Sequence, residues 1–241
     1  MERDDSGAAG LGSGHRANLI HTGIVLLLLF WVQRGFTPRS IILMAFGLLL
    51  SLGLVYLTSP ILPSAVQRAI SFLPGIHVEA AVAADAASTW YARTEVARIG
   101  IEMIPQYFWL GRGFTRYADV IPGSREALDS ITFAVLQGHF LNGFIGLMVN
   151  TGVFGAIGMI VFLLSGVALA ARVLRRVRQT SFDTTLDRTS AVICCVFLVD
   201  VVFFFFIEGN ADWALRRFGM YVGMLFACWR LLDRRDWQTS T

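Results

Sequence analysis

Long apolar runs alternate with short polar segments along most of the chain, and these runs predict membrane-spanning helices. A helix needs about 20 predominantly apolar residues to cross the hydrocarbon core of a bilayer. Five runs come close to this length, and they occupy residues 20–36, 41–57, 140–174, 191–207 and 218–232. The pattern therefore predicts an all-α integral membrane protein with about five transmembrane helices.

The polar segments divide the chain into regions of different character. The predicted regions are a disordered tail at 1–18, two spans within 19–58, a loop at 59–138, one span within 139–174, a basic loop at 175–190, two spans within 191–233 and a tail at 234–241. A loop as long as 59–138 is usually functional or disordered. Because apolar residues recur in it at helical spacing, we expect short amphipathic helices there, one of them from Ala86 to Ile104 and closed by Pro105.

The arginines predict how the chain is oriented. Basic residues concentrate in the turn at 33–39, in the segment at 172–188 and at the C-terminus. With five spans, these three segments fall on the same side of the membrane. Cytoplasmic loops carry the excess of basic residues, so this side is predicted to be cytoplasmic and the long loop to be extracytoplasmic.

Composition agrees with a membrane protein and excludes some functions. Hydrophobic residues make up 55% and charged residues 15% of the chain, whereas soluble domains carry about 25% charge. The net charge of +3 is too small to indicate a nucleic-acid partner. Cys194, Cys195 and Cys228 lie in apolar runs without a histidine at ligand spacing. We interpret them as membrane-facing or packing residues, and we expect neither a metal nor another cofactor.

Candidate chemistry begins within residues 90–114. On a helix, Arg93 shares a face with apolar residues such as Val96 and Met103, so it leads an apolar stripe. An arginine there either meets a partner or anchors at the lipid headgroups. Arg98 has acidic residues three positions before it and four after it, which is the spacing of ordinary ion pairs on a solvated helix face.

Two further features follow Arg93 along the chain. Gly111, Arg112 and Gly113 form a turn whose backbone is able to approach a ligand closely, and an arginine suits bidentate contact with phosphate. His139 stands at the start of a long apolar run. A neutral histidine can take a proton from a hydroxyl group at physiological pH, but a lone histidine at the start of a span is also often only an interfacial residue.

These segments resemble the O-antigen ligase and O-antigen polymerase family of bacterial polytopic membrane proteins. The resemblance lies in AVQRAISFLPGI at 65–76, STWYARTEVARIGIEMIPQYFWLGRGF at 88–114 and GHFLNGFIGLMVNTGVFGAIGMI at 138–160. A tryptophan and an arginine open a helix, a proline and aromatic residues follow, and a turn of glycine, a basic residue, glycine and an aromatic residue comes next. A histidine before a glycine-rich span completes the pattern.

The resemblance implies a metal-independent glycosyltransferase in the bacterial inner membrane, with the long loop facing the periplasm. Its donor would be a glycan on undecaprenyl diphosphate, and its acceptor would be a lipid A–core sugar or another lipid-linked glycan. It implies that Arg93 and Arg112 hold the diphosphate, with Gly111 and Gly113 shaping the turn, and that His139 activates the acceptor hydroxyl. Fixed guanidinium groups would stabilise the charge that develops on the leaving diphosphate.

Two other classes of function stay open on the sequence. The family usually has about ten to twelve spans and this sequence predicts five, so a partner supplying the missing N-terminal spans is expected. A non-catalytic or truncated membrane subunit of a polysaccharide assembly system is therefore the first alternative. A small transporter is the second, but Asp200 is the one charge in the middle of a predicted span.

Overall fold

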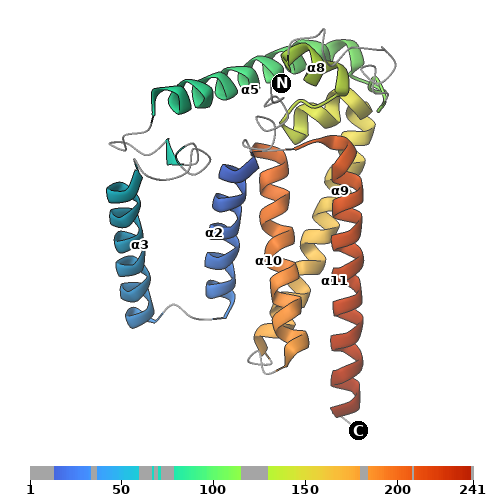
Figure 1. The fold of residues 1–241 in the computed structure, drawn as a ribbon. Coiled ribbons are helices and arrows are strands. Elements are labelled where there is room, and N and C mark those ends of the chain that lie inside the picture. The colour runs from blue at the N-terminus through green and yellow to red at the C-terminus, as the bar shows by residue number, and fades with distance from the viewer. Residues whose placement is uncertain are drawn as a thin grey trace, which may run out of the picture.

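The computed structural model describes residues 14–33, 37–59, 67, 70–71, 79–114, 130–179, 184–207 and 209–239. All regular elements in these ranges are helices (Figure 1). They are α2 (Gly14–Val32), α3 (Pro38–Thr58), α5 (Ala80–Tyr107), α8 (Ser130–Gln137), α9 (Gly143–Gln179), α10 (Thr185–Phe206) and α11 (Ala211–Thr239). The predicted all-α class is confirmed for this part of the chain.

Three of the described helices, α3, α9 and α10, are long and apolar enough to cross a membrane. The predicted total of five spans is not reached by this measure. In α2 the apolar stretch Ile20–Val32 is too short, and α11 carries arginines near both ends of its apolar part. The helices therefore support a membrane protein, while the complete number of spans stays a prediction.

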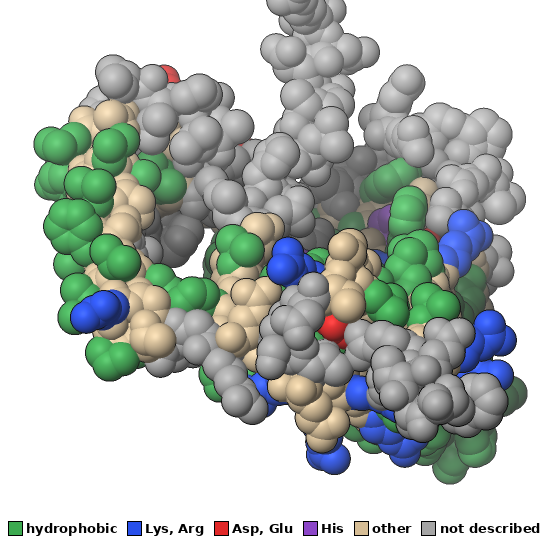
Figure 2. Space-filling view, turned by 90° about the horizontal axis from the view of Figure 1, so that it is seen from below, with side chains coloured by type: hydrophobic (Ala, Val, Ile, Leu, Met, Phe, Trp, Pro, Cys, Tyr) green, Lys and Arg blue, Asp and Glu red, His purple; other side chains and the backbone are tan. Residues whose placement is uncertain are grey.

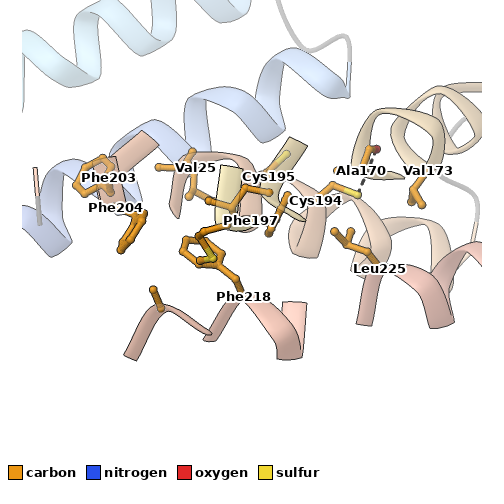
Figure 3. Packing of buried hydrophobic residues seen from close by; sticks show 14 of the residues in the cluster. Val25, Ala170, Val173, Cys194, Cys195, Phe197, Phe203, Phe204, Phe218 and Leu225 are labelled. Carbon is orange, nitrogen blue, oxygen red and sulfur yellow. Dashed lines mark hydrogen bonds between the residues drawn. The ribbon is translucent and has the colours of Figure 1, made fainter. Parts of the chain in front are cut away.

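Helices α9, α10 and α11 pack along one another, and α2 packs against α10 (Figure 1). Aromatic residues fill the space between them, and Figure 3 shows Phe197 and Phe204 pointing toward Phe218 of α11. The rings of Phe197 and Phe218 meet edge to face at 6.0 Å. In lipid the surrounding hydrocarbon is as apolar as the side chains, so the hydrophobic effect does not drive helices together. Close packing such as this one holds them together instead, through van der Waals contacts. Cys194 and Cys195 are fully buried in this core, which agrees with the predicted packing role.

Glycine allows a close approach between helices in this core at Gly166 of α9. A Cβ atom there would lie 2.6 Å from the ring of Phe197 and 3.0 Å from Val222. Small residues at such positions let helix backbones come together. Gly158, two turns earlier in α9, has no atom within 4 Å of a Cβ built on it. The packing role therefore belongs to Gly166.

An ion cluster inside the bundle joins α2, α10 and α11. Asp200 is only 3% exposed, and its Oδ1 lies 2.7 Å from Nε2 of His21 and accepts a 2.6 Å hydrogen bond from Nη2 of Arg217. Tyr221 adjoins this pair. A charge within the apolar part of a membrane protein is costly unless it is paired. The cluster thus joins α2 to α10 and α11 at the level of Asp200 along the bundle.

The basic segments lie together at one end of the bundle, the lower end in Figure 1, and Figure 2 shows arginine side chains spread over this face. Arg176 of α9 binds Asp233 of α11 at 3.0 Å and stacks on Trp229. Arg178 stacks on Trp31 of α2 at 4.6 Å from the ring centroid. These arginines therefore connect α9 to α11 and to α2. They do so at the end of the bundle that the sequence predicts to be the most basic.

Helix α5 lies across the opposite end of the bundle (Figure 1). The expected helix from Ala86 to Ile104 is instead 28 residues long, and Pro105 lies inside it. A proline in the last turn costs a helix few hydrogen bonds, so the helix continues to Tyr107. The expectation of short helices and of a stop at Pro105 is wrong on this point.

Three predicted borders differ from the structure. Helix α2 begins at Gly14, within the predicted tail at 1–18, while residues 1–13 lie outside the described ranges. Helix α9 continues to Gln179 and α11 to Thr239, into the predicted basic loop and C-terminal tail. Arg176 and Arg178 in the last turn of α9 interact favourably with the helix dipole, which suits the extension of that helix. Most of 65–76, a segment of the family resemblance, lies outside the described residues.

The packing of Gly166 is testable with two matched substitutions on α9. We expect Gly166→Leu to lower the free energy of unfolding by about 1–3 kcal/mol, because the added atoms overlap Phe197. Gly158→Leu adds the same atoms where a Cβ meets nothing, so its stability should stay equal or rise slightly. Unfolding of the detergent-solubilised protein by sodium dodecyl sulfate measures both, and equal stability of the two variants would contradict this packing.

Candidate functional site

A break in α9 lies at the centre of the candidate site. Gly152 has φ 66° and ψ −172°, which is not helical, so the chain forms a short helix before it and a long one after it. In an unbroken helix the carbonyls of Val149 and Asn150 would accept hydrogen bonds from residues four positions later. The break frees these two carbonyls and the N–H group of Val153.

Residues 108–113, the docked segment, provide partners for these freed groups. The N–H of Arg112 donates to the carbonyl of Val149 at 2.8 Å, and the N–H of Gly113 donates to the carbonyl of Asn150 at 2.9 Å. In return the N–H of Val153 donates to the carbonyl of Phe108 at 2.7 Å. The broken helix and the docked segment therefore complete each other's backbone hydrogen bonds.

Glycine makes this contact possible on both sides. Gly111 has φ 69°, and a Cβ atom on it would lie 2.4 Å from the backbone of Asn150. A Cβ atom on Gly152 would lie 2.4 Å from the carbonyl oxygen of Trp109. The sequence predicted that this turn approaches a ligand, which stays a prediction; in the structure Gly111 packs against the backbone of α9. Gly113, with φ 85°, has open space around it.

The side chain of Arg112 ties the docked segment to α8. Its Nε donates to Oδ1 of Asn150 at 3.1 Å, and its Nη2 donates to the carbonyls of Val135 and Leu136 at 2.8 and 3.4 Å. These carbonyls belong to the last turn of α8, where a positive charge is favourable. Its guanidinium also lies 5.4 Å from the centre of the Phe140 ring. Arg112 therefore caps α8 and borders the site at the same time.

Asn150 is a member of the site that sequence reasoning missed. Its side chain is buried at 4% exposure, accepts from Arg112 and donates from Nδ2 to the carbonyl of Gly138 at 3.3 Å. The available signal was an amide within the apolar run at 140–174, since a buried polar group needs partners. Asn150 thereby joins the docked segment to the residue before His139.

His139 lies in the short connection between α8 and α9. Its N–H donates to the carbonyl of Ala134 at 2.9 Å, so the end of α8 sets its position. Its Nε2 lies 4.0 Å from Oδ2 of Asp212 in the first turn of α11, and both side chains are less than one-third exposed. Asp212 lies between the fourth and fifth predicted spans, and its spacing in the sequence does not place it at His139. The structure brings the two together.

Arg93 approaches the same region from α5. Its Nη1 donates a 3.5 Å hydrogen bond to the carbonyl of Ile207, the residue that ends α10. The next turn of α5 carries Val96, which is buried against Phe140, so the predicted apolar stripe under Arg93 is confirmed.

Arg98 lies on the other face of α5, as its spacing predicts. Its side chain is 57% exposed and pairs with Glu95 and Glu102. The hydrogen bond from Arg98 lowers the pKa of Glu95. Arg98 is thus an ordinary surface ion pair and serves as a control for Arg93.

The three predicted site residues meet around the connection between α10 and α11, which we call the 207–212 connection. Arg93 contacts Ile207 at its start, and His139 lies opposite Asp212 at its end. Arg112 and Asp212 line one small pocket together with Asn150. Glu208, which belongs to this connection, lies outside the described residues. The arrangement offers guanidinium groups, an imidazole and a carboxylate at one end of the bundle.

Gly111 and Gly113 offer a matched test of the docked segment. Alanine at either position must adopt a left-handed backbone, which costs about 1–2 kcal/mol. At Gly111 the added carbon also overlaps the backbone of Asn150, whereas at Gly113 it meets open space. We therefore expect Gly111→Ala to be clearly less stable than Gly113→Ala in thermal unfolding of the solubilised protein. Equal losses in both variants would show that residue 111 does not contact α9.

Comparisons of the chain with protein-family models, with curated proteins and with solved structures found no match.

Proposed function

We propose that this protein is an O-antigen ligase- or polymerase-like membrane glycosyltransferase. It moves a glycan from undecaprenyl diphosphate to a lipid A–core sugar or to another lipid-linked glycan. The main support is that Arg93, Arg112 and His139, far apart in sequence, all meet the 207–212 connection. The family resemblance of the segments that contain them supplies the reaction class.

His139 is the general base in this proposal, and Asp212 assists it. A gap of 4.0 Å between Nε2 of His139 and Oδ2 of Asp212 is too long for a direct hydrogen bond. It leaves the Nε2 side of the imidazole to an acceptor hydroxyl, whose oxygen sits about 2.8 Å from Nε2 and donates its one proton to that atom. An acceptor hydroxyl placed there gives its proton to His139. The carboxylate of Asp212 then stabilises the imidazolium that forms.

The arginines stabilise the leaving group. The acceptor oxygen forms a bond to the anomeric carbon as the bond between that carbon and the diphosphate oxygen breaks, so negative charge grows on undecaprenyl diphosphate. Arg93 makes one long hydrogen bond to Ile207, and a phosphate oxygen is a stronger acceptor for its guanidinium than that carbonyl. Arg112 contributes a fixed positive charge at the pocket while it caps α8.

The proposed orientation follows from the two ends of the bundle. The arginine-rich end faces the cytoplasm, because basic residues in short connections are retained on that side. The end that carries α5, the docked segment and His139 then faces the periplasm. Helices α2 and α11 complete five spans in the inner membrane, with the paired charges of Asp200 and Arg217 held inside the bundle.

Substitution of His139 and Arg93 tests the proposed reaction. General bases contribute about 10²–10⁴-fold to rates, so His139→Ala should abolish surface glycan in a strain that depends on this gene. Arg93→Ala should do the same through the leaving group, and Asp212→Asn should cause a smaller loss. Glycan is measured on gels together with the amount of each variant in the membrane.

Arg98→Ala is the matched control for Arg93→Ala, because both remove an arginine from α5 and Arg98 is engaged only with exposed carboxylates in the contacts described above. Its surface glycan should equal that of the unchanged protein. Normal glycan in both His139→Ala and Arg93→Ala, at normal protein levels, would refute the proposed reaction.

One observation favours the second candidate function, a membrane subunit that works with partner spans. Among the residues of the apolar window of α3 whose burial the structure describes, none is buried. Figure 2 shows hydrophobic side chains along this helix, and apolar residues of α2 and α3 line a groove between them. A spanning helix without packing neighbours is what a missing set of helices would leave uncovered.

A photo-crosslinking amino acid at Leu43 or Leu50 of α3 tests this candidate. These side chains are 70% and 60% exposed, so a subunit that packs there should give a crosslinked protein product in the native membrane. Leu163 of α9, at 2% exposure, is the control position that should give none. Products that contain only lipid at both α3 positions would contradict the partner.

A further inference from the structure

Tryptophan side chains mark two levels along the described part of the bundle. Trp31 of α2 and Trp229 of α11 stack on arginines at the arginine-rich end. Trp213 lies in the first turn of α11, at the end across which α5 lies (Figure 1). At 1.5 Å per residue, the stretch of α11 from Trp213 to Trp229 spans about 24 Å. Tryptophans gather at both boundaries of the hydrocarbon core, which is about 30 Å thick. The level of Trp213 therefore marks the membrane boundary near α5.

Helix α5 lies at this boundary. In its middle, Arg93 donates to the carbonyl of Ile207, which ends α10, and the adjacent Phe206 is 78% exposed. Just after α5, Trp109 packs on Phe154 of α9 with ring centroids 6.1 Å apart, and both side chains are exposed. Large exposed apolar residues continue along the same side of α9, and they are Ile157, Val161 and Leu164. The exposed apolar surface of a spanning helix thus extends to the end of α5.

One face of α5 packs on the rest of the protein. Val96 is buried in a cluster with Phe140, and a Cβ atom on Gly100 would lie 2.5 Å from the side chain of Ile145 in α9. This contact fixes how α5 is rotated about its own axis. The other faces of the helix are therefore presented to the surroundings in a defined direction.

Two exposed flanks of α5 differ in polarity. Positions three or four residues apart share a helix face. The exposed residues of the apolar flank are Ala83, Ala87, Trp90, Thr94, Ile101 and Pro105. The polar flank begins one position later, about 100° around the helix. Its exposed residues are Ala84, Ser88, Tyr91, Arg98, Glu102 and Gln106.

Hydrogen bonds agree with this division. The hydroxyl group of Thr94, the one polar side chain in the list of the apolar flank, donates to the carbonyl of Trp90 at 3.0 Å. Its donor is therefore satisfied within the helix, as an apolar environment requires. On the polar flank Arg98 pairs with Glu95 and Glu102, an arrangement that suits contact with water.

We propose that α5 is an interfacial helix that binds the lipid bilayer surface at the end of the bundle. Its apolar flank faces the hydrocarbon and its polar flank faces water. Surroundings that change from apolar to aqueous across one helix are those of a lipid boundary, where such helices bury their apolar face by about 5–10 Å. This position places Arg93, one turn from Trp90, at the level of the lipid phosphates. It is independent of the reaction proposed above, which concerns what Arg93 and His139 do.

Nitroxide spin labels on introduced cysteines test the position of α5 in the full chain, placed in phosphatidylcholine nanodiscs. The variants form neighbouring pairs with one label on each flank, and they are Ala83→Cys and Ala84→Cys, Ala87→Cys and Ser88→Cys, and Ile101→Cys and Glu102→Cys. Oxygen concentrates in hydrocarbon, whereas a neutral nickel chelate stays in water. In power-saturation EPR, each label on the apolar flank should be more accessible to oxygen and several-fold less accessible to the nickel chelate than its neighbour.

The two members of each pair are matched, because all six side chains are exposed and none packs on the bundle. Ile101 and Glu102 are both more than half exposed. The unchanged chain gives the background, since its cysteines are buried.

Three results would overturn the interfacial position of α5. Equal access of the nickel chelate to both members of each pair would place α5 in water, away from the lipid. A preference for oxygen at both members would place the whole helix in hydrocarbon. Little access of either reagent to the apolar flank would show that protein, and not lipid, covers it.

Discussion

A backbone that leaves the helical conformation inside a membrane protein must find hydrogen bonds within the protein, because lipid offers none. Helix α9 leaves it at Gly152, and the docked segment at 108–113 returns the lost bonds through Arg112, Gly113 and Phe108. Unsatisfied backbone groups would cost several kcal/mol in such surroundings. The break in α9 and the glycine turn therefore depend on each other, and neither is stable alone.

The candidate site follows from this mutual dependence. Once the docked segment is in place, Arg112 reaches the last carbonyls of α8, and Asn150 holds the carbonyl of Gly138. His139 then projects from the end of α8 toward Asp212. The backbone of His139 is thus fixed by its hydrogen bond to Ala134 at the end of α8, and precise placement of this kind is what a reactive side chain requires. The ion pair of Asp200 with Arg217 joins α10 to α11, the helix whose first turn carries Asp212.

The sequence predicted the helical class, the grouping of the arginines and the buried face under Arg93, because these depend on local periodicity and charge. It could not predict what Arg112 binds, since Asn150 lies 38 positions later and the docking requires a break in α9. The pairing of His21 with Asp200 could not be predicted for the same reason, because the two residues are distant in the chain. Gly158 and Gly166 look alike in sequence, and only the crossing of α9 with α10 distinguishes them.

The central claim is that residues 108–113 complete the hydrogen bonds of the broken α9. Hydrogen–deuterium exchange of the full chain in nanodiscs measures it directly, because amide protection reports on hydrogen bonds that open rarely. The account predicts that the amides of Arg112, Gly113 and Val153 exchange as slowly as those of the neighbouring helical turns of α9. Exchange of Arg112 and Gly113 as fast as that of an exposed loop would contradict it.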